Sequence, residues 1–131
     1  MRLPSSLIFC VLSFVCLSSC SGADQGMKKF KLSADEIVPI ATGYGGCFAT
    51  DHITVDGKKV GYMYREESDR PEDSGWRFFS ADETQAYVDD PENTMIYDVN
   101  TIANYDRAIV PFLDAPPGSR FGRVGETFVA E

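Results

Sequence analysis

The stretch "CFATDHITVDGKKVGYMYRE", residues 47–66, carries the clearest strand signal in the chain. Its two halves are rich in β-branched and aromatic residues, and they lie on either side of Asp56-Gly57. An Asp-Gly pair between two such runs favours a tight hairpin turn. Alternation along each strand then places certain side chains on a common face. These are Ile53 and Val55 on the first strand, and Val60, Tyr62 and Tyr64 on the second.

Further strands are expected after this hairpin. The aromatic run at 76–79 predicts a third strand, with Trp76 and Phe78 pointing one way and Phe79 the other. The later assignments are a fourth strand or short extended piece at 95–99, a loop at 114–122, and a late edge strand at 127–130.

Several short helices are expected around these strands. The same four letters, Ser-Ala-Asp-Glu, begin at Ser33 and at Ser80 and fit a capping box at a helix start. The first helix is cut short by Pro39, and the second ends near Asp90, before Pro91. Two later N-caps are Asn100 and Asp106, with Pro111 interrupting the second helix. The predicted fold is α+β, with a small antiparallel sheet of about three to five strands and two or three short helices in one domain, residues 32–131.

The N-terminus reads as a targeting segment. Arg2 precedes an apolar run from Leu7 to Leu17, about half the length that spans a bilayer, so residues 1–19 are predicted to be a signal peptide. Leu17-Ser18-Ser19-Cys20 resembles the bacterial lipobox, which implies a lipid on Cys20 and a bacterial cell-membrane or outer-membrane location. Ser21 at the next position favours the outer membrane. An ordinary secretory signal with a free Cys20 is the alternative.

The cysteines and lysines near this end have simple interpretations. If the signal is removed and Cys20 is lipidated, only Cys47 remains as a thiol, and no internal disulfide is expected. Its surroundings indicate a small buried strand residue rather than a reactive group. Residues 20–31 are predicted to be a tether, whose lysines are either solvated or rest on anionic lipid headgroups.

Acidic residues dominate the charge. The net charge is −8, and it becomes −9 when Arg2 leaves with the signal, which argues against nucleic-acid binding. Eleven acidic residues but only two arginines lie between Glu66 and Asp98. One interpretation is a solvated acidic surface around a core tryptophan, and the other is a docking face for a basic protein partner. The residues assigned to that face are Glu66, Glu67, Asp69, Glu72, Asp73, Trp76, Asp89, Asp90 and Glu92, with Tyr87 and Tyr97 as possible aromatic anchors.

No motif for catalysis or cofactor binding stands out. His52 is the only histidine, and on one regular strand it and Cys47 would point to opposite faces. One histidine and one thiol are too few for a zinc site, and no cofactor is expected. Adjacent carboxylates are abundant but point apart along an extended chain, which leaves a carboxylate hydrolase as a weak alternative.

Two long stretches carry a family resemblance. "KVGYMYREESDRPEDSGWRFFSADE" and "IYDVNTIANYDRAIVPFLDAPPGSRF" resemble a small bacterial domain family, some of whose members are immunity protein 33 of polymorphic toxin systems. The resemblance implies a non-enzymatic domain that binds and neutralises a toxin. It also places Ala81 where family members often have glycine, a change that the first turn of a helix accepts. The predicted function is a membrane-anchored lipoprotein that binds a protein partner, with an immunity protein in the cell envelope as the specific case. The alternatives are an envelope structural or small-ligand-binding lipoprotein and a carboxylate-dependent envelope hydrolase.

Overall fold

The computed structural model describes residues 28–131. The predicted signal peptide, the lipobox with Cys20 and the first part of the predicted tether lie outside the described residues. None of the helices formed by residues 28–131 has the length and hydropathy of a bilayer-crossing segment.

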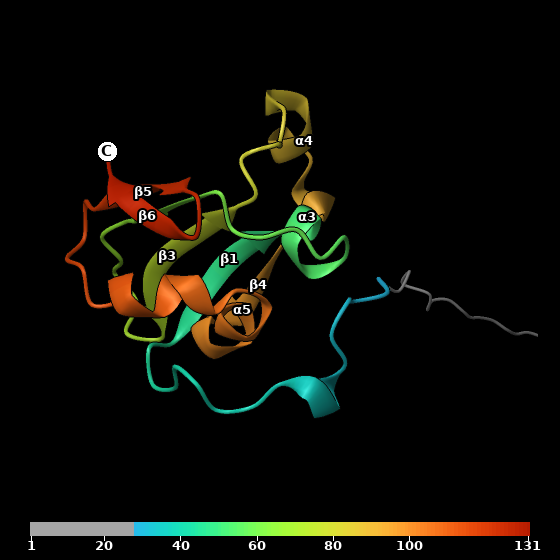
Figure 1. Ribbon diagram of the computed structural model, residues 1–131, viewed down its shortest axis with the longest axis horizontal. Coiled ribbons are helices and arrows are strands. Elements are labelled where there is room, and N and C mark those ends of the chain that lie inside the picture. Colours follow the sequence, from blue (N-terminus) through green and yellow to red (C-terminus); the bar gives the residue numbers. More distant parts are fainter. Residues whose placement is uncertain (1–27) are drawn as a thin grey trace, which may run out of the picture.

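One mixed sheet of six strands forms the centre of the fold (Figure 1). The strands are β1 Gly46–Thr50, β2 Tyr62–Arg65, β3 Asp73–Phe79, β4 Thr94–Asp98, β5 Arg120–Val124 and β6 Thr127–Ala130. Their order is β4-β1-β3-β2-β5-β6, with β1 and β3 parallel and every other pair antiparallel. The α+β class is confirmed, but the sheet is mixed and has more strands than predicted.

The hairpin prediction around Asp56-Gly57 is wrong. β1 stops at Thr50, and the chain turns into the helix α3, Asp51–Thr54. Gly57 adopts a positive φ of 79° and its amide bonds to the carbonyl of Ile53 at 3.1 Å, so this glycine ends a helix rather than joining two strands. β3 lies between β1 and β2 in the sheet. An Asp-Gly pair fits both a hairpin turn and the end of a helix. Here the residues before it, Asp51–Thr54, form a helix.

The other strand predictions are mostly confirmed. β3 contains residues 76–79, the run at 95–99 overlaps β4, and β6 matches 127–130. The predicted loop at 114–122 is wrong in its last part, where β5 begins at Arg120, because Gly122 and the preceding Pro-Pro-Gly sequence favour a loop over a strand. Val60 belongs to the core, whereas Tyr62 and Tyr64 lie on the opposite face with Phe79, so the predicted common face of these three is also wrong.

The helices are short and most begin at a cap. They are η2 Ala34–Glu36, α3, α4 Gln85–Asp89, η3 Pro91–Asn93, α5 Val99–Tyr105 and η4 Arg107–Phe112. The capping box at Ser33 and the N-cap at Asp106 are confirmed. Asn100 does not cap α5, because Asp98 does, accepting from the Asn100 amide at 2.8 Å.

Ser80 does not start a helix. α4 begins at the N-cap Thr84, and the preceding turn is organised by Glu83 instead. The Glu83 carboxylate accepts from the amides of Ser80 and Ala81 at 2.8 and 2.9 Å, and Thr50 Oγ1 donates to it at 2.5 Å. Within this turn Ala81 has a φ of 79°, in the left-handed region that favours glycine. The sequence analysis placed Ala81 in the first turn of a helix, and this prediction is wrong.

Replacing Ala81 with glycine is expected to stabilise the fold by about 1 kcal/mol, because glycine has no Cβ to oppose the left-handed conformation. Urea unfolding followed by tryptophan fluorescence measures the change. Ala86→Gly, inside α4, is the matched control and is expected to destabilise. Equal destabilisation by both substitutions would contradict the strained turn.

The hydrophobic core lies on one side of the sheet, under α5 and η4 (Figure 1). Trp76 and Phe78 of β3 are fully buried there against Ile102 of α5 and Leu113 after η4. Their predicted orientation is confirmed, since Phe79 lies on the other face. The segment 32–45 wraps the outside of α5, where the Asn100 side chain accepts from the amides at 40 and 41.

Candidate protein-binding face

The helices α5 and η4 cover one face of the sheet and leave the opposite face uncovered. Side chains from four neighbouring strands share it, as their registry shows: Phe48 is paired with Ile96 and Arg77, Arg77 with Tyr64, and Phe79 with Tyr62. We call these six residues the open face. Ile96 is 68% exposed and Phe48 is 37% exposed, whereas the rings of Tyr64 and Phe79 stack at 5.9 Å. The open face is thus an aromatic and aliphatic floor that retains accessible apolar surface.

Arg77 is the charged group at the centre of this floor. Its guanidinium lies 4.5 Å from the ring centre of Phe48 and forms ion pairs with Glu66 at 2.8 Å and with Asp73 at 3.0 Å. The Asp73 pair is doubled, because Nη1 and Nη2 each donate to one carboxylate oxygen. Arg77 is only 8% exposed, so these two carboxylates neutralise a largely buried guanidinium and hold it in place.

Two carboxylates of this part of the chain, Asp73 and Glu83, are stabilised as anions. Hydrogen bonds from the Arg77 guanidinium hold the pKa of Asp73 well below its usual range. Burial opposes ionisation of Glu83, but the donors Thr50 and Ser80 outweigh it and lower the pKa of that carboxyl. Neither Asp73 nor Glu83 therefore has the raised pKa that suits a carboxyl acting as a general acid.

Acidic side chains border the open face at one end of β3. Glu67, Asp69 and Glu72 lie in the exposed loop that joins β2 to β3. Together with Phe48 and Ile96 this loop lines a hollow of about 350 Å³. The partner-binding residues predicted in this loop therefore do lie beside the apolar floor.

A second acidic border lies at the other end of β3, on α4 and η3. Asp89, Asp90 and Glu92 are exposed there, and Val88 of α4 closes a neighbouring hollow of about 300 Å³. β3 has seven residues, so the two borders are separated by roughly 20 Å along the strand. The acidic residues therefore form two clusters with the apolar floor between them, rather than the one continuous surface that their order in the sequence had suggested.

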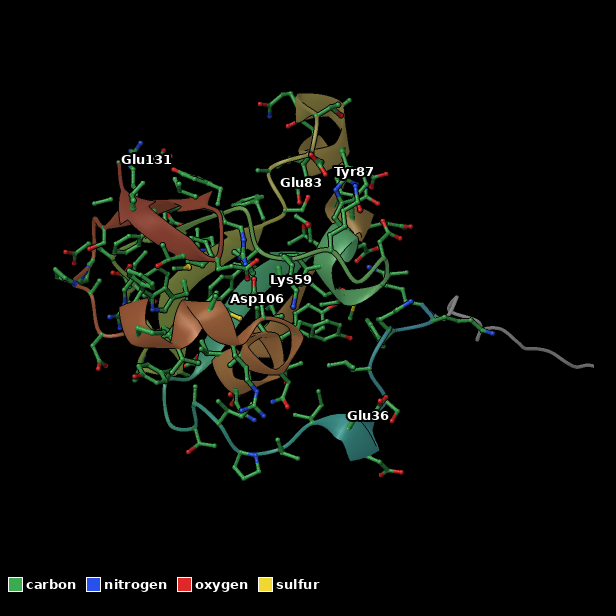
Figure 2. The ribbon with its side chains drawn as sticks, in the orientation of Figure 1. Glu36, Lys59, Glu83, Tyr87, Asp106 and Glu131 are labelled. Atoms are coloured by element: carbon green, nitrogen blue, oxygen red, sulfur yellow. The ribbon has the colours of Figure 1, made fainter. Side chains whose placement is uncertain are left out.

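The junction of α3 and α4 fixes the position of the second border (Figure 2). The ring of His52 packs on Tyr87 with centroids 4.3 Å apart and the two ring planes tilted by 39°. Its Nδ1 lies 3.0 Å from Ser80 Oγ and 3.7 Å from Glu83. Ser80 and Glu83 both approach the same ring nitrogen, so the three groups do not form a relay through the imidazole. This cluster joins α4 to the body of the domain.

Three residues predicted to bind a partner also have roles inside the fold, and partner binding by Glu66 and Asp73 stays a prediction. Trp76 is fully buried, and its indole donates to the carbonyl of Leu113 at 3.1 Å, so it is part of the core and not of a surface. Glu66 and Asp73 are engaged by Arg77. Tyr97 also faces the core, where its hydroxyl lies 3.0 Å from Thr54 Oγ1.

Sequence reasoning missed the floor itself. Phe48, Ile96 and Arg77 were not selected, because an exposed and a buried apolar residue look alike in a strand. The alternation in 62–64 and 77–79 did place Tyr62, Tyr64 and Phe79 on definite faces, but nothing in the sequence showed which face the helices would leave open.

The remaining candidates for chemistry are separated. Cys47 is buried as predicted, and burial raises the pKa of its thiol strongly. The sequence predicted that His52 and Cys47 share one strand. In the structure His52 lies on α3 instead. Among residues 28–131, no group of three or more His, Cys, Asp or Glu side chains is arranged to hold a metal ion.

Fold and face together describe a small α+β domain with an open, partly apolar face on its sheet. A family model for the immunity protein Imm33 domain matches residues 47–129, and the chain belongs to this family. The resemblance found in the sequence is therefore confirmed. Comparisons with curated proteins and with solved structures found no match.

Proposed function

We propose that this protein is an immunity protein that neutralises a toxin by binding it through the open face and its two acidic borders. The observation that carries the proposal is the accessible floor around Phe48 and Ile96, in a chain that belongs to the Imm33 family. Apolar centres surrounded by charged residues are typical of protein interfaces, where the centre supplies affinity and the border supplies selectivity.

The charges define the partner that fits this face. Arg77 is neutralised by Glu66 and Asp73, so the net charge presented at each end is negative. A complementary toxin surface has an apolar centre and basic residues about 20 Å apart on either side of it. Such a field speeds association more than it slows dissociation.

The proposed site of action is the bacterial envelope. A lipid on Cys20 would hold the domain at a membrane outside the cytoplasm, where it meets a toxin that acts in the envelope or passes through it. The outer membrane is the proposed location, from Ser21 after the lipidated cysteine.

If a toxin is encoded beside this gene, that toxin is the probe for the interface. The double substitution Glu67→Lys/Glu72→Lys is expected to weaken binding of that toxin about tenfold at low salt, through a slower association rate. The difference shrinks as salt rises, because exposed charges are screened. Surface plasmon resonance on the full chain, at about 50 to about 500 mM salt, gives the association and dissociation rates. Glu66 and Asp73 are left intact so that Arg77 keeps its partners.

The matched control is Asp35→Lys/Glu126→Lys, which makes the same charge change away from the open face. It is expected to leave both rates close to those of the parent protein. Ile96→Asp tests the floor directly, and its effect is expected on the dissociation rate. Equal effects of the two charge pairs, together with an unchanged affinity for Ile96→Asp, would place the interface elsewhere. A neighbouring toxin that binds none of these proteins would sink the immunity function itself.

A further inference from the structure

All five lysines of the chain lie in two short segments, 28–31 and 58–59. The structure packs these segments against each other, although Lys31 and Gly57 are far apart in the sequence. The Lys31 amide donates to the carbonyl of Thr54 at 2.7 Å, and the side-chain carbons of Lys31 lie beside Gly57. We call Lys28, Lys29, Lys31, Lys58 and Lys59 the lysine corner. Its 28–31 segment lies across the molecule from β5 and β6 (Figure 1), whereas Lys59 lies nearer the centre of the view (Figure 2).

The charge of the lysine corner is only partly neutralised. Lys28 forms an ion pair with Asp51 at 2.9 Å, and Lys58 forms an exposed pair with Asp82 at 3.0 Å. Among the residues from 28 onwards, no carboxylate lies within ion-pair distance of Lys29, Lys31 or Lys59, and all three are exposed. A chain with an excess of acidic residues thus keeps a local site of positive charge.

An exposed aromatic ring lies within the lysine corner. Phe30, between Lys29 and Lys31, is 42% exposed, and its inner edge packs at right angles on Tyr97 with ring centres 6.1 Å apart. An accessible aromatic ring flanked by lysines is the combination that binds the interfacial region of a membrane, the ring among the headgroups and the ammonium groups on anionic phosphates.

The position of the corner in the chain agrees with this chemistry. Lys28 is the first described residue, and it follows Cys20 by eight residues. Eight residues span at most about 28 Å when fully extended. A lipid on Cys20 therefore keeps the lysine corner within that distance of the bilayer, where local attraction is effectively intramolecular.

We propose that the lysine corner and Phe30 dock on the headgroups of an anionic phospholipid bilayer and hold the domain against the membrane in one orientation. The proposal rests on the lipid anchor at Cys20 that forms part of the proposed function. The second acidic border adjoins the corner, because Lys28 Nζ donates to the carbonyl of Glu92 at 2.6 Å. The first border lies at the other end of β3, and an anionic surface that attracts the corner repels this border away from the bilayer. Docking then leaves the first acidic border, Glu67, Asp69 and Glu72, directed away from the lipid and accessible to a toxin.

The test uses the full lipidated protein in vesicles, with the lipid on Cys20 verified by intact mass. Phe30→Trp places a reporter in the corner, because the native Trp76 is fully buried and contributes a constant background. In vesicles with about a third phosphatidylglycerol, the introduced indole is expected to shift to the blue and to be quenched by brominated acyl chains. In pure phosphatidylcholine it is expected to stay open to acrylamide.

The control reporter is Val129→Trp, at a 47% exposed position on β6 across the molecule. It is expected to remain quenched by acrylamide in both kinds of vesicle. Adding Lys29→Gln/Lys31→Gln to the Phe30→Trp protein is expected to lower the ratio of docked to lifted domain about 25-fold, since each lysine near an anionic surface contributes about fivefold. Equal acrylamide quenching at residue 30 in anionic and neutral vesicles would overturn the proposal.

The two proposals fail in different ways. A mass without lipid on Cys20 removes the anchor, and with it the membrane part of the proposed function. A lipidated protein whose residue 30 stays in water removes only the docking of the lysine corner. The Lys29→Gln/Lys31→Gln protein is expected to bind its toxin in solution as the parent does, because neither lysine lies on the open face.

Discussion

Replacing Trp76 with alanine is expected to destabilise the fold by about 4 kcal/mol, the largest effect of any single truncation in the core. The ring is fully buried, stacks on Phe78 with centroids 5.9 Å apart, and lies 6.3 Å from the ring of Phe121. The substitution leaves a large cavity between β3 and η4 and the carbonyl of Leu113 without its donor. Urea unfolding followed by circular dichroism measures the loss, since the variant has no tryptophan.

Trp76→Phe separates the core role from the interface role that the sequence had suggested. It keeps most of the buried area and removes the 3.1 Å hydrogen bond, so it is expected to remain folded at 25 °C with a smaller loss of stability. Toxin binding by the folded Trp76→Phe protein is expected to equal that of the parent. A large loss of affinity without loss of stability would return Trp76 to the interface.

Replacing Asp106 with alanine is expected to cost about 3 kcal/mol, because its carboxylate joins three parts of the fold in a buried position. Oδ2 accepts from the Val60 amide at 3.0 Å and from Arg123 Nη1 at 2.8 Å, and Oδ1 caps η4 through the Ala108 amide at 3.1 Å. Figure 2 shows Asp106 near the centre of the molecule. Removing it leaves a largely buried guanidinium without its principal anion.

Thermal unfolding of Asp106→Ala, with Asp106→Asn beside it, measures this contribution. The amide retains an acceptor for the backbone but not the charge, so its loss is expected to be smaller. Glu126→Ala is the matched control, because Glu126 approaches the same arginine at 3.8 Å from a fully exposed position and its removal is expected to leave the midpoint unchanged. Similar shifts for Asp106→Ala and Glu126→Ala would contradict the buried network.

The predictions about stability and the predictions about binding concern different parts of the domain. Trp76 and Asp106 set the stability of the domain from inside, whereas the open face and the lysine corner carry no core residue. Variants of those two surfaces are therefore expected to change binding while leaving the unfolding midpoint near that of the parent protein, and stability measured in parallel tells the two kinds of effect apart.

The sequence by itself determined the local features of this protein. Period-two alternation placed Trp76 and Phe78 opposite Phe79, and the capping residues at Ser33 and Asp106 marked two helix starts, because both signals depend only on near neighbours in the chain. Composition predicted the excess of acid, and two long stretches indicated the family that the Imm33 match then showed.

Only the tertiary structure decided how these pieces meet. Insertion of β3 between β1 and β2 overturned the hairpin at Asp56-Gly57, since strand order depends on contacts between residues far apart in the sequence. The same pairing gathered Phe48, Arg77 and Tyr64 on one face and sent Glu66 and Asp73 to neutralise the arginine. Whether a charge is exposed or paired, and whether an aromatic ring is core or surface, follows from what packs against it, and that is a property of the folded chain alone.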